Sequence, residues 1–554
     1  MQRGGLITSR GMNNLSSQHR GSIIHNLKTG VFDLLVIGGG ITGAGIALDA
    51  ASRGLKTALV EKNDFSFGTS SRSTKLIHGG LRYLKQLEFG LVREVGSERA
   101  VVHRLAPHLV VPEKMLLPLY EKRGFGSLLT SFGLKLYDWL AGVKPEDQRK
   151  MLTKSQTHGY EPLLRKDEVK GGAIYAEYRT DDARLTIEIV KTAARHGADV
   201  INYCKVTDFI YEVGKITGVK AADEFGTDEF IIKAKAVVSA TGPWVDELRE
   251  IDRSKTGKYL HLTKGIHLVV AFEKLPVKQA IYFDVEDGRM IFAIPRGRTT
   301  YIGTTDTNYS GSIDKVDASR EDAEYLVRAV NQTFPGVKLT MSDIESSWAG
   351  LRPLIHEEGK SASELSRKDE IFESPSGLIS IAGGKLTGYR KMAERVVDLV
   401  ISNTFEGLNL KNCFTDKISL VASGFENYGE VKSYCSLIAG RVQKSGLNGM
   451  YVNYLVSNYG KQTDLILNDM KGGDPERELA LAELRFTFQH EMAMKPLDFI
   501  VRRTGILYFY KNRITHIKEA VLNEFQRHFG WSKERLQFEI ENLETAVREV
   551  TNFR

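Results

Sequence analysis

Cysteine is scarce in this chain of 554 residues, which has three: Cys204, Cys413 and Cys435. Their number is odd and no two are spaced as CxxC, so they can form neither a disulfide framework nor a zinc cluster, and we expect no metal. This scarcity indicates a reducing compartment that faces the cytosol. The chain also lacks any run of about 18 or more uncharged apolar residues, which excludes a spanning helix but leaves surface attachment open.

A concentrated basic patch is missing as well. Lys and Arg (76) exceed Asp and Glu (69) by 7, and the excess is spread along the chain. A nucleic-acid binder normally concentrates its positive charge on one face, so we expect no nucleic-acid partner. An anionic small substrate or an anionic membrane surface fits this balance at least as well. The rest of the composition is that of a soluble globular protein, and the length predicts several domains.

The first 30 residues contain no acidic residue and four basic ones: Arg3, Arg10, Arg20 and Lys28. No apolar block in this segment is long enough for a secretory signal. Organelle transit peptides can have such a composition, but we expect residues 1–30 to form a flexible basic extension.

A glycine-rich turn follows the first apolar run of the chain. Residues 32–37 predict a strand, and Gly38, Gly40 and Gly43 form a G-x-G-x-x-G pattern at the start of a predicted helix. The three glycines permit a tight turn, close approach of a pyrophosphate, and close packing of helix on strand. Glu61 ends the next predicted strand and is placed to accept hydrogen bonds from ribose hydroxyls. Together these features predict a Rossmann-like dinucleotide site.

Two further loops favour FAD as the dinucleotide. Residues 68–75 carry hydroxyl and backbone donors that can follow the cofactor from its pyrophosphate toward a flavin ring. Residues 381–387 predict a strand leading into a helix start with a cation, Lys385, which would stabilise an anionic reduced flavin. The candidate cofactor-binding residues are Gly38, Gly40, Gly43, Glu61, Thr69, Ser70, Ser71, Ser73, Lys75, Gly79, Gly242, Gly384, Lys385, Leu386 and Thr387.

A second G-x-G-x-x-G with a strand and a helix around it is absent from the sequence. A flavoprotein that takes hydride from NAD(P)H usually has two such units. We therefore expect the flavin to be reduced by a bound small substrate and oxidised by oxygen, a quinone or another protein.

The remainder of the chain divides by its periodicity. Alternating segments between about 262 and 345 predict an antiparallel sheet, while helical periods dominate beyond about 430. We expect an α/β fold in which a Rossmann-like FAD-binding domain and an antiparallel-sheet substrate domain are interleaved over 31–400. A mainly helical C-terminal domain is expected over 401–554.

Several cationic residues lie in turns rich in glycine or proline, or beside the cofactor loops. They are Arg82, Arg352, Arg367 and Lys385. An arginine held in a rigid turn suits bidentate recognition of a carboxylate or a phosphate. For each one alone, a structural ion pair is the more ordinary role; four near cofactor loops favour an anionic substrate.

A set of longer motifs is more specific than the glycine pattern. The motifs are residues 38–43, 69–71, 75–84, 181–184, 240–245, 264–267, 303–306, 350–354 and 383–387. In these motifs and their order, the chain from about residue 30 onward closely resembles the FAD-dependent glycerol-3-phosphate dehydrogenases. The resemblance implies oxidation of sn-glycerol 3-phosphate at C2 to dihydroxyacetone phosphate, with hydride transfer to flavin N5. It also implies a homodimer and a substrate site of Arg82, Tyr83, Arg352, Arg367 and Lys385.

Oxidation of a secondary alcohol also requires a base within hydrogen-bond reach of its hydroxyl group. His78 is the first candidate, because a neutral imidazole can accept a proton near pH 7, and His267 is the second. A histidine satisfied inside a strand would explain His267 equally well. With Arg352 these two make up the predicted catalytic group, and His261 is expected to be incidental.

The electron acceptor is inferred from features of other branches of the family. Oxidase members resemble longer chains with an inserted segment, and mitochondrial members carry an EF-hand extension; we find neither feature in this sequence. We therefore expect a bacterial-type enzyme that reduces a membrane quinone, attached peripherally to the inner face of the cell membrane. An oxygen-reducing glycerol-3-phosphate oxidase is the alternative.

Quinone reduction requires contact with a bilayer, and two segments are candidates for it. Residues 125–140 place apolar side chains on one helical face beside basic residues, a pattern found at membrane interfaces and more often in cores. The basic and aromatic residues 502–513 have the same two interpretations.

Two other functions stay open from the sequence. An oxidase of amino or hydroxy acids on the same fold could place a carboxylate between the arginines. A nucleotide-binding scaffold or a flavin-dependent nucleic-acid modifier belongs to a different class, which the absence of a basic patch disfavours.

Overall fold

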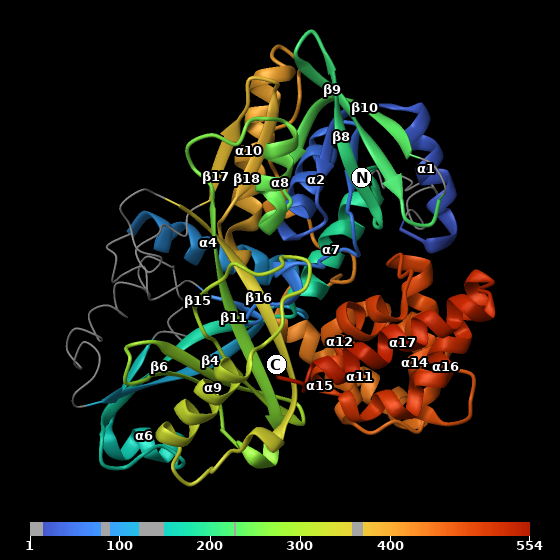
Figure 1. The fold of residues 1–554 in the computed structure, drawn as a ribbon. Helices are drawn as coiled ribbons and strands as arrows, with labels where there is room; N and C mark the ends of the chain where they lie inside the picture. Colours follow the sequence, from blue (N-terminus) through green and yellow to red (C-terminus); the bar gives the residue numbers. More distant parts are fainter. Residues whose placement is uncertain (1–14, 79–88, 121–148, 227–228, 357–368, 554) are drawn as a thin grey trace, which may run out of the picture.

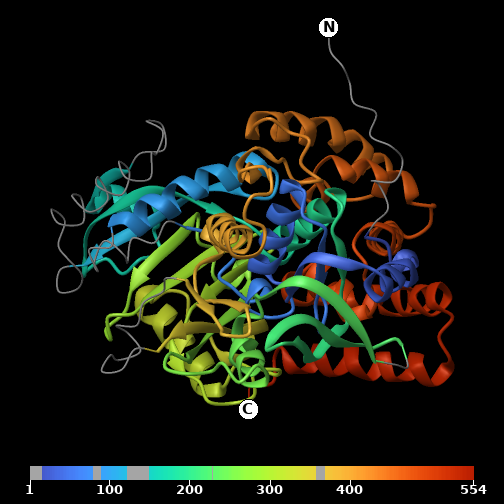
Figure 2. The same ribbon diagram turned by 90° about the horizontal axis from the view of Figure 1, so that it is seen from above.

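The computed structural model describes residues 15–78, 89–120, 149–226, 229–356 and 369–553. Figure 1 shows three parts: a sheet with helices at the top, a second large sheet at the lower left, and the C-terminal helices at the lower right. Figure 2 shows the same parts from above.

The first sheet has a core of parallel apolar strands. β1 (Val31–Ile37) lies between β2 (Thr57–Val60) and β10 (Glu229–Ser239) and is parallel to both. The order is β17-β18-β10-β1-β2-β7, and β9 and β8 continue antiparallel from β10. The other strands are β7 (Asp199–Ile201), β8 (Cys204–Glu212), β9 (Lys215–Asp223), β17 (Glu370–Glu373) and β18 (Leu378–Ala382).

The helix predicted after the glycine turn is α2 (Ile41–Arg53), which packs against α7 (Asp182–Arg195) and α10 (Tyr389–Thr404). It ends at Gly54, whose φ of 106° lies in the left-handed region that glycine adopts without strain. The predicted order of strand, turn, helix and strand is thereby confirmed. Two other helices of this part are α4 (Phe89–Leu105) and α8 (Val245–Ile251).

The second sheet extends well beyond the predicted 262–345. β11 (Leu260–Ala271) pairs antiparallel with β14 (Thr299–Gly303) and β16 (Ile344–Ile355), as expected. The sheet also recruits β4 (Val111–Tyr120), which pairs parallel with β12, so the sheet is mixed. Its other strands are β3 (Leu76–Ile77), β5 (Lys150–Thr153), β6 (Val169–Arg179), β12 (Ala280–Asp284), β13 (Met290–Arg296) and β15 (Thr307–Asn308), and its helices are α6 (Lys154–Tyr160) and α9 (Arg320–Thr333).

From residue 428 onward the described chain is helical. The helices are α11 (Tyr428–Lys444), α12 (Met450–Tyr459), α13 (Thr463–Asp469), α14 (Pro475–His490), α15 (Ile506–Phe509), α16 (Lys511–Phe529) and α17 (Lys533–Glu549). Residues 502–509 are buried in the core: Arg502 and Arg503 form buried ion pairs, and Tyr508 and Phe509 pack against Trp348. The membrane interpretation of this segment is therefore wrong. Residues 125–140 lie outside the described residues.

The N-terminal segment differs from the expected flexible extension. Residues 20–29 form α1 (Arg20–Thr29), which buries Ile23 and Leu27 in the core of the first sheet. Arg20 is buried too, donating to Asn202 Oδ1 at 3.1 Å and pairing with Asp223. The basic composition of this segment concealed an amphipathic helix, and residues 1–14 lie outside the described residues.

A buried ionic cluster joins the C-terminal helices to the first sheet. Arg184 of α7 donates to both carboxylate oxygens of Glu491, at 2.7 and 2.9 Å. Arg503 donates to both oxygens of Asp64 at 2.7 and 2.8 Å, just after β2. Because the charges are paired and hydrogen-bonded, their burial fixes the C-terminal helices on the nucleotide part. Within the described ranges, no helix is both long and apolar enough to cross a bilayer.

Candidate functional site

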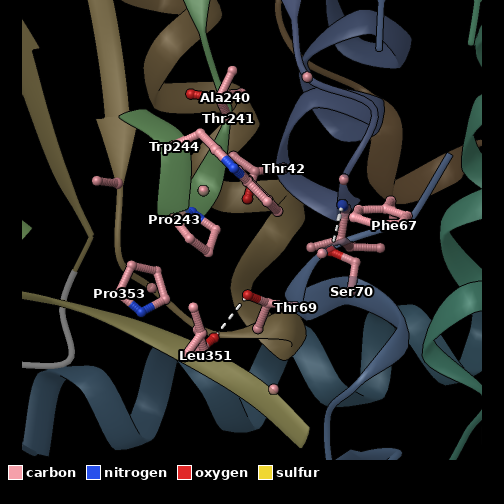
Figure 3. A pocket seen from close by; sticks show the side chains of 18 of the residues that line it. Thr42, Phe67, Thr69, Ser70, Ala240, Thr241, Pro243, Trp244, Leu351 and Pro353 are labelled. Carbon is pink, nitrogen blue, oxygen red and sulfur yellow. Dashed lines mark hydrogen bonds between the residues drawn. The ribbon is translucent and has the colours of Figure 1, made fainter. Parts of the chain in front are cut away.

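A cavity of about 470 Å³ runs from the glycine turn of the first sheet to the second sheet. Figure 3 shows side chains that line it, from the turn after β10 (Thr241, Pro243, Trp244) and from β16 (Leu351, Pro353). The cavity thus lies where the carboxyl ends of β1, β10 and β18 face β11 and β16. Crevices at the carboxyl ends of parallel strands are the usual binding sites of this class of sheet.

Two of the three fingerprint glycines, Gly38 and Gly43, are required by close backbone packing, as the sequence predicts. Gly38 has a φ of 111°, and a methyl group there would lie 2.6 Å from the carbonyl oxygen of Ala240. A methyl group at Gly43 would overlap the carbonyl oxygen of Gly38, so this glycine lets α2 pack closely on β1. Gly38 and Gly40 line the cavity, whereas Gly43 lies behind them.

Glu61 closes the same end of the cavity. Its Oε2 accepts a hydrogen bond from the Gly39 N–H at 2.7 Å and its Oε1 one from Asn63 N–H at 2.8 Å. Burial raises the pKa of this carboxyl group. Each oxygen has a further lone pair, so Glu61 can accept ribose hydroxyls while it braces the turn.

The loop over 68–75 divides into residues that face the cavity and residues that face away. Thr69 Oγ1 donates to Leu351 O at 2.8 Å, and Ser70 Oγ accepts from Ile41 N–H at 3.0 Å, as the dashed lines in Figure 3 mark. These two and Ser73, three of the predicted cofactor residues, line the cavity.

Ser71 and Lys75 do not line the cavity, against the prediction that they bind the cofactor. Lys75 is buried, and its Nζ lies 2.5 Å from Asp182 Oδ1. Burial alone would lower the pKa of Lys75, but Asp181 and Asp182 raise it. Ser71 is likewise buried and directed at backbone carbonyl groups of its own turn, Phe67 O and Gly68 O.

The element after β18 forms another wall of the cavity. Gly383 and Gly384 have φ values of 77° and 78°, and Lys385, Leu386 and Thr387 follow them. All five line the cavity just before α10 begins, as does Gly242 on the β10 side, so these predicted cofactor residues are brought together.

Arg352 stands at the opposite end, held by the motif at 303–306. Its Nη1 donates to Asp306 Oδ1 and to Thr305 O, both at 3.1 Å, and its Nη2 donates to Thr304 Oγ1 at 3.0 Å. A methyl group at Gly265 would lie 2.5 Å from Nη2, so the guanidinium lies directly over that glycine. The arginine is therefore rigid and faces the cavity, as bidentate anion recognition requires.

The two candidate bases occupy different depths. His78 is half-buried and lines the cavity, with its ring 6.3 Å from that of Phe292. His267 also lines it but is only 1% exposed, stacked on Trp348 at 4.7 Å, with Nε2 3.0 Å from Thr74 Oγ1. Burial, and then the charges of Arg352 and Lys75, hold the pKa of His267 well below its usual range, so the ring is neutral.

Other predicted residues lie elsewhere. His261 is bonded to Asn308 at 2.9 Å and does not line the cavity. Gly79, Arg82, Tyr83 and Arg367 fall outside the described residues. Thr74 was missed as a site residue; the available signal was its place between two predicted cofactor residues, Ser73 and Lys75.

These features fit an FAD. Left-handed glycines leave the backbone of two turns open, a carboxylate stands at the nucleotide end, and hydroxyl groups and Lys385 follow along the cavity. The residues that would hold the cofactor are Gly38, Gly40, Glu61, Thr69, Ser70, Gly242, Gly384, Lys385 and Thr387.

Comparison with known proteins supports FAD as the cofactor of this cavity. The family model "FAD dependent oxidoreductase" matches residues 33–390, and the model "C-terminal domain of alpha-glycerophosphate oxidase" matches residues 413–536. The aerobic glycerol-3-phosphate dehydrogenase of Bacillus subtilis (strain 168) is 48% identical over 96% of this chain and 98% of its own. That of Staphylococcus aureus (strain USA300) is 47% identical over 97% and 98%.

Solved structures give the same result. The glycerol-3-phosphate dehydrogenase from Bacillus halodurans, solved in complex with FAD, has a TM-score of 0.83 and 46% identity, over 97% of this chain and 99% of that one. The L-alpha-glycerophosphate oxidase of Mycoplasma pneumoniae shares the fold alone, at 18% identity and a TM-score of 0.54 over 69% of this chain and 96% of its own. The chain therefore belongs to the FAD-dependent oxidoreductases and, within them, to the aerobic glycerol-3-phosphate dehydrogenase family.

Proposed function

We propose that this enzyme oxidises sn-glycerol 3-phosphate to dihydroxyacetone phosphate. The observation that carries the proposal is the rigid Arg352 guanidinium beside a neutral His267, at the end of a cavity built for FAD. The nearly full-length relatives at 47–48% identity are named for this substrate.

A bound FAD would supply the hydride acceptor for oxidation of the substrate at C2. The protein supplies binding and proton transfer. Arg352 presents guanidinium donors to an anionic or developing negative oxygen, and Lys385 adds a second positive charge on the far wall. Arg82, Tyr83 and Arg367 complete the proposed substrate site by resemblance.

His267 is the base we favour over His78. It is neutral, and its ring is held between the Trp348 indole and the backbone of Gly303, its neighbours on β16 and β14. A neutral imidazole in fixed orientation can accept a proton, directly or through one bridging group. Replacing His267 by Gln should slow flavin reduction by about a hundredfold or more, and replacing His78 by Gln by much less. The reverse ranking would assign the base to His78.

The substrate is tested with a panel of alcohols and amino acids and a dye as electron acceptor. We expect turnover with sn-glycerol 3-phosphate and little with sn-glycerol 1-phosphate, glycerol or glycine. Turnover of glycine in preference to the phosphate ester would support the amino acid oxidase alternative and contradict our proposal.

For the acceptor we propose a membrane quinone, reached by peripheral attachment to the inner face of the cell membrane, in a homodimer. The absence from the sequence of an oxidase-type insertion supports the quinone over oxygen. The second family model takes its name from an oxidase, so oxygen is the competing acceptor. Turnover with oxygen alone should be slow and should rise when a soluble quinone is added; equal rates would indicate the oxidase.

A further inference from the structure

The ring of His267 has almost no surface of its own in the cavity. It is 1% exposed, covered by Trp348 on one side, and its Nδ1 is buried without a hydrogen-bond partner among the described residues. A substrate hydroxyl therefore cannot approach the ring freely. A proton that reaches His267 has to arrive through a neighbouring group that does face the cavity.

Thr74 is that neighbour. Its side chain is half-buried and lines the cavity, and its Oγ1 lies 3.0 Å from His267 Nε2. A hydroxyl group can donate one hydrogen bond and accept two others, so Thr74 can bond to the ring and to a substrate oxygen at once. Within the described part of the chain, it is the ring's one hydrogen-bond partner.

One carboxylate holds the residues on both sides of Thr74. Asp182 Oδ2 accepts from Ser73 N–H at 2.9 Å, and Asp182 Oδ1 accepts from Lys75 Nζ at 2.5 Å. Lys75 has a φ of 57°, a left-handed conformation that a side chain other than glycine adopts only when it is held there. Asp182 is fully buried at the first turn of α7, so this clamp is rigid.

Two side chains of the second sheet add to the clamp. Tyr301 Oη donates to Thr74 O at 3.1 Å, and Trp348 Nε1 donates to Ser73 O at 3.2 Å. Trp348 is also the residue on which the His267 ring is stacked. The same indole thus fixes both the imidazole and the loop that carries Thr74, which sets their separation.

We propose that Thr74 relays the proton of the substrate's C2 hydroxyl group to His267; this inference rests on the proposed function. The C2 hydroxyl gives its proton to Thr74 Oγ1 while the proton of Thr74 passes to the Nε2 lone pair. The C2–O bond becomes a carbonyl as C2 loses hydride to the flavin. Thr74 ends as a neutral hydroxyl and His267 as an imidazolium, so protons and electrons balance.

The test compares Thr74→Val, which keeps the shape and removes the hydroxyl, with Thr74→Ser, which keeps the hydroxyl. In anaerobic stopped-flow mixing with sn-glycerol 3-phosphate, we expect flavin reduction about a hundredfold slower in Thr74→Val and within about threefold of wild type in Thr74→Ser. The substrate concentration at half-maximal rate should rise by no more than about tenfold, because one hydrogen bond to the substrate is lost while the phosphate contacts remain. A wild-type rate in Thr74→Val would overturn the relay.

A double variant separates a relay from a packing role. In a His267→Gln background, Thr74→Val should cost nothing further, because the two residues act on one proton. Independent losses that multiply would contradict the proposal. FAD content and melting temperature are measured for each variant, and Thr74→Ala replaces Thr74→Val if the latter does not hold FAD. If wild-type flavin is not reduced at all, the proposed function fails; if only the Thr74 variants behave as wild type, the relay alone fails.

Discussion

Arg503 and Asp64 form a fully buried, bidentate ion pair between the C-terminal helices and the loop that follows β2. The two Nη atoms lie 2.7 and 2.8 Å from the two carboxylate oxygens, and neither side chain has any solvent exposure. Asp64 follows Glu61 by three residues, so the C-terminal domain fixes the loop that braces the FAD end of the cavity. Through this loop the C-terminal domain supports the end of the cavity at which Glu61 stands.

Replacing Arg503 by Met should therefore weaken both stability and FAD binding. It leaves Asp64 with less of its charge compensated, and breaking a buried pair in this way costs about 3–5 kcal/mol. FAD affinity, measured by fluorescence titration of the apoprotein, should fall by about tenfold. Arg527→Met is the control, since Arg527 pairs with Glu524 at the surface and should change neither value. Equal effects in the two variants would contradict the account.

The pH dependence of stability should carry a contribution from Glu491. Burial alone would raise its pKa, but Arg184 and Lys191 bring the pKa of this carboxyl group to about 2, from an ordinary value of 4.5. The folded protein thus binds this proton more weakly than the unfolded chain, and the stability it provides, on the order of 3 kcal/mol, is complete above about pH 4.5 and lost as the pH falls toward 2.

In Glu491→Gln the free energy of unfolding should change less with pH between pH 5 and 3 than in wild type. It should also be lower at neutral pH. Urea titrations over that range measure the slope. Glu541→Gln, at an exposed position, is the control and should leave the slope as in wild type. An unchanged slope in Glu491→Gln would show that this carboxyl group does not dominate the acid response.

Gly43→Ala should destabilise the nucleotide part by about 2–4 kcal/mol. Its methyl group would overlap the carbonyl oxygen of Gly38, so α2 would have to move away from β1. A lower melting temperature and loss of bound FAD are expected. Gly21→Ala is the matched control, because a methyl group at Gly21 meets nothing within 4 Å in α1. Wild-type stability in Gly43→Ala would mean that the turn relaxes freely.

Arg352→Lys should lower kcat/KM for sn-glycerol 3-phosphate by about a hundredfold. Lysine keeps the charge but cannot span Asp306, Thr304 and a substrate oxygen at once. Arg298→Lys, which alters a pair with Glu345 away from the cavity, should keep wild-type kinetics. If kcat/KM of Arg352→Lys is the same as that of Arg298→Lys, Arg352 does not bind the substrate.

The nucleotide end of the site could be predicted because its signals are local. Strand, glycine turn, helix and Glu61 follow one another within about thirty residues, and each carries its own pattern. Lys75 shows the limit of such patterns, because a polar loop does not reveal which of its side chains face the cavity. The Lys75 side chain instead binds the carboxylate of Asp182, 107 residues away.

Long-range pairings could not be predicted for the same reason. Arg184 and Glu491 are 307 residues apart, and Arg503 and Asp64 are 439 apart, so no window of sequence contains either pair. The recruitment of β4, β5 and β6 into the second sheet likewise depends on pairings that no local pattern marks: β4 pairs with β12, 165 residues along the chain, and with β6, 49 to 68 residues along the chain. The sequence did not predict α1, because the basic composition of the segment drew more attention than Ile23 and Leu27, which lie one helical turn apart.

Mixing the FAD-loaded protein with sn-glycerol 3-phosphate in the absence of oxygen tests whether this substrate reduces the flavin. We predict that the yellow absorbance of the flavin bleaches and that one dihydroxyacetone phosphate forms per flavin. A flavin that stays oxidised with this substrate, yet is reduced by dithionite, would show that the protein does not oxidise sn-glycerol 3-phosphate.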